Sequence, residues 1–110
     1  MLFKFERLNQ ITKYKSLKII IMDINCMENR ILNATGVLQP TILRAILNLY
    51  NGGLHLMTAR NVIDECNIID NAVDWNGRLA AICNSMRNAT DCGGIIVGED
   101  IDCNHFTIEF

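Results

Sequence analysis

A stripe of apolar side chains between residues 75 and 86 restricts how this 110-residue chain can fold more than any other feature. Its members follow one another at i, i+4, i+7, i+8 and i+11, the spacing of one continuous helix face; they are Trp75, Leu79, Ile82, Cys83 and Met86. Asp74 stands before the stripe, where its carboxylate can accept from N–H groups of the first turn. Gly93-Gly94 supplies an end. The sequence therefore predicts a helix with one face buried in a core.

Two further helical patterns precede this stripe. Pro40 is well placed to open the first, because the N–H that proline lacks has no partner at the first helical position. Asn51-Gly52-Gly53 ends that pattern, since glycine readily adopts the left-handed cap conformation. Thr58 resembles the N-cap of the second pattern. The apolar face of the second pattern consists of Val62, Ile63 and Cys66.

The last seventeen residues have the pattern of a β-hairpin. Residues 94–98 and 105–110 are rich in β-forming side chains, and the turn formers of residues 99–104 separate them. Phe106, Ile108 and Phe110 share one face at period two, so we expect them to cover the core.

The first 38 residues form a basic extension in this interpretation. Residues 16–25 contain a short β-branched run, which favours a strand, although a buried helix turn fits the same run. Neither this run nor the N-terminus has the length of a membrane span or the composition of a secretion signal. We therefore expect a soluble, cytoplasmic protein that does not contact a membrane.

The element order is helix, short strand, helix, longer helix and hairpin, and it resembles the winged helix-turn-helix superfamily. Leu56-Met57-Thr58-Ala59-Arg60-Asn61-Val62 looks like the lead into that family's second helix. Asn76-Gly77-Arg78-Leu79-Ala80-Ala81-Ile82 resembles the start of its recognition helix, and Cys92-Gly93-Gly94-Ile95-Ile96 the turn into its wing. The resemblance implies an α+β domain of three helices and a C-terminal β-hairpin over residues 39–110, preceded by the extension.

In that family the third helix enters the major groove of DNA. Its non-core face would then carry the DNA-binding residues; these are Asn76, Arg78, Ala81, Asn84, Ser85, Arg87 and Asn88. Arginine can bond guanine and asparagine can bond adenine, each through two hydrogen bonds. An ordinary solvated helix face is the alternative interpretation of the same residues.

Charge divides the functional hypotheses. Residues 1–18 hold five Lys or Arg against one Glu, whereas residues 61–110 hold two Arg against nine Asp or Glu. Glu99, Asp100 and Asp102 lie on the predicted wing, where acidic groups repel phosphates. The element order and the polar residue types on the third helix nevertheless lead us to expect a homodimeric winged-helix regulator that binds double-stranded DNA. The alternative is a protein–protein interaction module, or an inhibitor, that presents an acidic surface.

Enzyme chemistry has little support. His105-Phe106-Thr107-Ile108 fits the H-x-T-x element of two-histidine phosphoesterases, which need two such elements for an acid and a base. The threonine after His55 stands one place too far along. We expect no catalytic residue and no cofactor.

The five cysteines have an odd count and form no C-x-x-C pair, so we expect reduced thiols. Cys92, Cys103 and His105 match no standard zinc spacing, and we expect no metal site.

Overall fold

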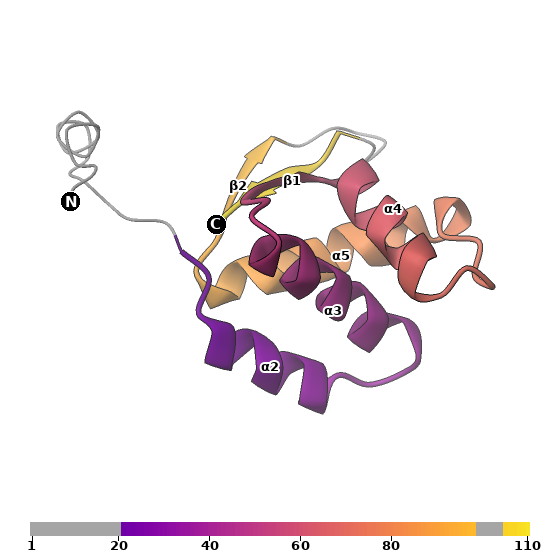
Figure 1. Cartoon of the computed structure of the whole chain (residues 1–110), viewed down its shortest axis with the longest axis horizontal. Coiled ribbons are helices and arrows are strands. Elements are labelled where there is room, and N and C mark those ends of the chain that lie inside the picture. The colour runs from indigo at the N-terminus through magenta and orange to yellow at the C-terminus, as the bar shows by residue number, and fades with distance from the viewer. Residues whose placement is uncertain (1–20, 99–104) are drawn as a thin grey trace, which may run out of the picture.

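The computed structural model describes residues 21–98 and 105–110, which form an α+β fold (Figure 1). The described part contains four α-helices: α2 (Ile24–Asn33), α3 (Leu38–Asn51), α4 (Ala59–Ile69) and α5 (Leu79–Ala89). Two 3₁₀ turns, η1 (Asn76–Arg78) and η2 (Thr90–Cys92), flank α5. Strands β1 (Leu56–Thr58), β2 (Ile95–Gly98) and β3 (Thr107–Glu109) form an antiparallel sheet. None of the helices described here is long and apolar enough to cross a membrane.

Helices α3 and α4 confirm the first two predicted helices, but the third helix is not the longer one as expected, since α3 has 14 residues and α5 has 11. Helix α3 begins at Leu38, so Pro40 lies inside the first turn rather than at its first position, where its missing N–H still costs no helical bond. Thr58 caps α4 as predicted, because its Oγ1 accepts from the Asn61 N–H at 3.2 Å. The Asn61 Oδ1 accepts from the Thr58 N–H at 2.9 Å, which completes a reciprocal capping box.

Helix α5 carries the predicted stripe, but it begins later than the sequence indicates. Asp74 precedes η1, and its Oδ1 accepts from the Gly77 N–H of that turn at 3.2 Å. The α-helix itself starts at Leu79. Trp75 is buried on the approach to η1, where its Nε1–H donates to the carbonyl of Asp70 at 2.8 Å. The tryptophan therefore anchors the α4–α5 connection as well as the core.

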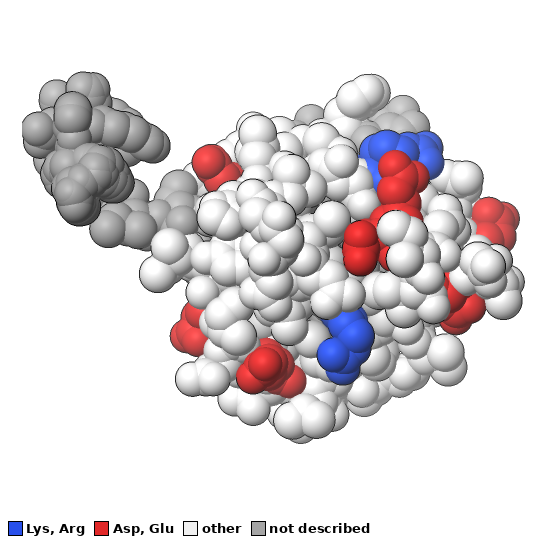
Figure 2. Space-filling model, in the orientation of Figure 1, with Lys and Arg blue, Asp and Glu red and all other residues white. Residues whose placement is uncertain are grey.

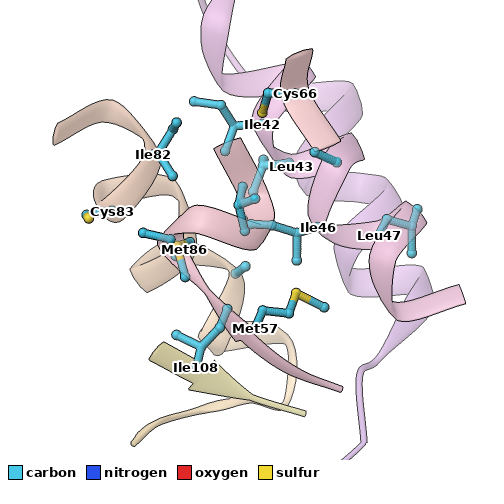
Figure 3. Packing of buried hydrophobic residues seen from close by; sticks show 14 of the residues in the cluster. Ile42, Leu43, Ile46, Leu47, Met57, Cys66, Ile82, Cys83, Met86 and Ile108 are labelled. Atoms are coloured by element: carbon cyan, nitrogen blue, oxygen red, sulfur yellow. The ribbon is translucent and has the colours of Figure 1, made fainter. Parts of the chain in front are cut away.

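The sheet order is β1-β3-β2, so β3 lies in the middle. Met57 of β1 and Ile108 of β3 are in register and fully buried. Figure 3 shows both side chains directed from the sheet toward Met86 and Ile46 of the helices. Phe106 and Phe110 are also buried, which confirms that one face of the last strand covers the core.

The predicted strand over residues 16–25 does not extend into the described residues, and residues 16–20 lie outside them. Residues 21–23 form no regular element, and α2 begins at Ile24. Asp23 is its N-cap, since its Oδ1 accepts from the Cys26 N–H at 3.1 Å. Met27 and Ile31 are buried within the common core. The packed unit therefore includes residues upstream of the predicted boundary at residue 39.

A disulfide between Cys26 and Cys92 joins α2 to η2 across 66 residues of sequence, with a Cα–Cα distance of 5.5 Å. The prediction of reduced thiols is wrong for this pair, because folding brings two distant cysteines within bonding reach. Two further bonds tie the same elements: the Asp23 N–H donates to the Cys92 carbonyl at 2.6 Å, and Arg30 pairs with Asp91 at 3.2 Å. The structure thus holds α2 against the end of α5.

The other two described cysteines, Cys66 and Cys83, are buried thiols on the inner faces of α4 and α5. Burial, and secondarily the charge of Glu65, raises the pKa of the Cys66 thiol to about 12. Cys103 lies outside the described residues.

Gly93 forms the turn from η2 into β2. Its φ is +113°, and a Cβ at this position would collide with the Ile21 carbonyl oxygen. Only glycine satisfies both conditions without displacement. This close approach places the chain segment that precedes α2 beside the start of β2.

Candidate nucleic-acid interface

The outward face of α5 is polar and free of carboxylates. Asn84 and Asn88 lie on successive turns and are exposed, and Ala80 continues the same line toward the start of the helix. Asn76 and Arg78 are exposed on η1, one turn before the helix rather than on it. This surface retains four of the seven predicted DNA-binding residues as exposed polar groups.

Ser85 differs from these exposed residues. It is only 4% exposed, so it is buried on α5, and its assignment as a DNA-binding residue stays a prediction. Ser85 lies three residues after Ile82 and one before Met86, which places it on the inner stripe despite its hydroxyl. The three-residue spacing between Ile82 and Ser85 indicates a buried position. The polar residue type of Ser85 instead suggests the exposed face of the helix.

Ala81 is half-buried at the edge of the outward face. Together with Asn84, Ser85 and Asn88 it lines a hollow of about 410 Å³. The α2–α3 connection and the start of α3 form the opposite wall, which includes Thr35 and Gln39. A ligand that reaches Ala81 must therefore enter beside this connection.

Arg87 lies at the opposite edge of α5, next to the sheet. Its guanidinium carbon is 4.6 Å from the centre of the Phe106 ring, and the side chain is half-buried. This cation–π contact holds the charge near the hairpin. Arg87 is thus a positioned cation and not a freely extended helix-surface group.

Arg60 is a further cation near this surface that the sequence reasoning missed. Its Nη1 donates to the Asn76 Oδ1 at 3.1 Å and lies 3.9 Å from a carboxylate oxygen of Asp64. Arg60 also lines a hollow of about 390 Å³ with Thr58, His105 and Thr107. Arg60 lies in the first turn of α4, where a positive charge is unfavourable next to the helix dipole. This placement is the feature of the sequence that could have marked Arg60 as a candidate binding residue.

The charges of the described residues do not form one continuous basic surface. Five arginines and eight carboxylates are present in this part of the chain. Figure 2 shows acidic groups scattered over the face formed by α2, α3 and α4, with isolated arginines between them. Neither η1 nor α5 contains a carboxylate, so the two arginines of this segment have no acidic neighbour on their own element. The predicted acidic wing residues Glu99, Asp100 and Asp102 lie outside the described residues.

The residues considered for metal or acid–base chemistry lie only partly within the described part of the chain. Cys92 is committed to the disulfide, and Cys103 lies outside the described residues. Within residues 21–98 and 105–110, no group of three or more metal-binding side chains is found. The ring of His55 stacks on Tyr50 at 4.5 Å, while His105 lines the hollow beside Arg60. His55, which directly precedes β1, thus packs against the end of α3.

No protein-family model matches this chain, and no curated protein and no solved structure is significantly similar to it.

Proposed function

We propose that the chain is a winged helix-turn-helix domain that binds double-stranded DNA through α5 and acts as a small regulator. The architecture supports this proposal, because α3, β1, α4, α5 and the hairpin follow one another in that family's order. The strand order β1-β3-β2, with the hairpin paired to the strand before α4, is compatible with the same layout.

The observation that carries the proposal is the contrast between α5 and the rest of the described chain. Elements η1 and α5 each contain one arginine and no carboxylate, in a body where carboxylates outnumber arginines, and Asp74 is the acidic residue that flanks η1. Phosphates repel acidic surfaces and attract arginine, so this is the described element best suited to approach DNA.

Each exposed side chain has a role in this proposal. Asn84 and Asn88 face outward one turn apart and would contact base edges, where asparagine bonds adenine through two hydrogen bonds. Arg78 would contact guanine or a phosphate at the start of the helix. Arg60 and Arg87 are each held by another side chain, and they would contact the phosphates on either side.

Fluorescence anisotropy on a mixed-sequence duplex, measured over a range of salt concentrations, tests the proposal. We expect the logarithm of the binding constant to fall linearly with the logarithm of salt concentration. Arg78→Ala should weaken binding and reduce this slope by about one. Arg44→Ala is the matched control, since Arg44 is exposed on α3 and lines a different hollow with Glu28 and Leu32. Absence of binding at low ionic strength would rule out DNA as the ligand.

A protein-interaction module is the second candidate function. The excess of carboxylates in the described body favours it, because an acidic surface suits a basic protein partner. A pull-down from native lysate separates the two functions. Recovery of nucleic acid without a stoichiometric protein partner would contradict the module.

The cytoplasmic location stays a prediction. The Cys26–Cys92 disulfide weighs against it, since disulfides are rare in the reducing cytosol. Mass spectrometry of alkylated protein, taken directly from its native source, would decide whether this bond exists there.

A further inference from the structure

Strand β2 is an edge of the sheet, and no other strand among the described residues pairs with its outer side. It lies at one end of the order β1-β3-β2, and its consecutive apolar residues Ile95, Ile96 and Val97 are 40%, 43% and 45% exposed. Natural proteins protect such edges with charged residues, proline or covering elements. The segment from Gly93 to Gly98 contains neither a charge nor a proline.

The opposite edge differs. Strand β1 passes directly into α4 at Ala59, and its central residue Met57 is fully buried. Among the other strongly exposed apolar residues, Leu32 and Ile68 lie on helices and Val37 is the N-cap of α3, so none of them offers a strand edge for pairing. The combination of an open backbone edge and adjacent exposed apolar side chains is therefore particular to β2 among the described strands.

We propose that β2 is a homodimerisation edge, which pairs antiparallel with β2 of a second copy of this chain. The pairing centres on Ile95, so that Ile95 lies directly opposite its counterpart in the second copy and Ile96 lies opposite Gly94 of that copy. The two sheets would join into one continuous sheet through their β2 edges. This proposal concerns self-association and does not rest on DNA binding.

A second copy suits this edge because a twofold interface must complement itself. An uncharged strand meets its own copy without placing like charges opposite each other, which would be destabilising. The nearest carboxylate in the sheet is Glu109 on β3, one strand further in and in register with Ile95. Across the dimer the two Glu109 strands would be three strand spacings apart, or roughly 14 Å. This exceeds the Debye length of about 8 Å at physiological salt, so their repulsion is largely screened.

The interface is short, which determines its strength. The irregular register between Ile96 and Gly98 leaves Val97 without a partner residue on β3 and bends the strand there. Regular pairing is therefore confined to Ile95 and Ile96, and the buried area falls below that of a standard stable interface. We expect a weak dimer whose population depends on protein concentration.

Sedimentation velocity on the full chain over a range of concentrations tests this proposal. The mass should rise with concentration from 12.4 kDa toward twice that value. Ile95→Lys should raise the dissociation constant at least about tenfold, because the dimer would then bury two like charges side by side. The new lysine would lie beside Glu109 within its own sheet, so the monomer should keep its fold.

Ile68→Lys is the matched control, since it makes the same substitution at a residue that is 78% exposed on α4. It should leave the dissociation constant unchanged. If Ile95→Lys lost its circular dichroism signal, Ile96→Lys would replace it with the same expected result, since Ile96 lies within the pairing and is 43% exposed.

The proposal would be overturned by a monomer at every concentration, by a dimer unaffected by a folded β2 variant, or by an equal loss in Ile68→Lys. A monomer whose β2 amides resist hydrogen exchange would mean that another segment covers the edge, and it would overturn the proposal as well.

Discussion

The two faces of α5 differ in what constrains them. Ile82 and Met86 on the inner face are fully buried against other elements, whereas Asn84 and Asn88 on the outer face are exposed. The inner face must match the volume and shape of its surroundings, because protein cores are close-packed. The outer face makes no comparable demand on the fold, so its residue types are available for a ligand. Substitutions should therefore separate stability on the inner side from binding on the outer side.

Trp75→Ala should give the largest loss of stability, because it removes the largest buried side chain of the core stripe. We expect the free energy of unfolding to fall by about 3–5 kcal/mol, measured by urea denaturation with circular dichroism. Trp75→Phe retains an apolar ring but leaves the Asp70 carbonyl without its donor, and it should cost less. A near-neutral Trp75→Ala would contradict this view of the inner face.

Cys26→Ser should give the next largest loss, since it removes the bond that ties α2 to the end of α5. The chain-entropy model and its usual range predict a loss of about 2–4 kcal/mol. Thermal unfolding with and without dithiothreitol provides the control: reductant should destabilise the wild type and leave Cys26→Ser unaffected. Equal stability of reduced and oxidised wild type would show that the bond contributes nothing to the fold.

Thr58→Ala should have an intermediate effect, because it removes the hydroxyl that accepts from the Asn61 N–H at the start of α4. We expect a loss of about 1 kcal/mol in urea denaturation. Thr58→Ser keeps the hydroxyl and should retain most of the stability. A cost as large for serine as for alanine would assign the effect to the lost methyl group instead of the cap.

Asn84→Ala should have the smallest effect on stability, within about 0.5 kcal/mol, because its side chain is exposed. Its effect on DNA affinity should be larger, about 1–3 kcal/mol on the preferred sequence, if it contacts a base. Ser85→Ala is the matched neighbour, since Ser85 is buried and should leave DNA affinity unchanged. If Ser85→Ala weakened DNA binding and Asn84→Ala did not, the DNA-binding face of α5 would be the one that contains Ser85.

Cys66 adds a pH-dependent contrast between buried and exposed groups. Its thiol pKa is raised to about 12, so it stays protonated and unreactive in the folded protein at neutral pH. The stability that this neutral thiol contributes is present below pH 9 and is lost as the pH rises from about 9 to 12. Thiol labelling followed by peptide mass spectrometry should modify Cys66 at pH 8 only when denaturant is added. Rapid labelling of the native protein would contradict its burial.

Local sequence signals predicted most of the described helices and strands. The core stripe from Trp75 to Met86, the cap at Thr58 and the alternating face of Phe106 to Phe110 all depend on residues within a few turns of one another. The candidate site was predicted less completely. Asn84 and Asn88 are exposed as expected, but the polar residue type of Ser85 concealed its position on the buried stripe.

The sequence by itself determined which faces of α4, α5 and the last strand turn inward, because apolar periodicity and helix caps act over short distances. Only the tertiary structure decided what those elements meet. It paired Cys26 with Cys92, brought Arg60 to Asn76 and placed β2 at the end of the strand order. These features join segments far apart in the chain, and their contacts depend on how the whole core packs.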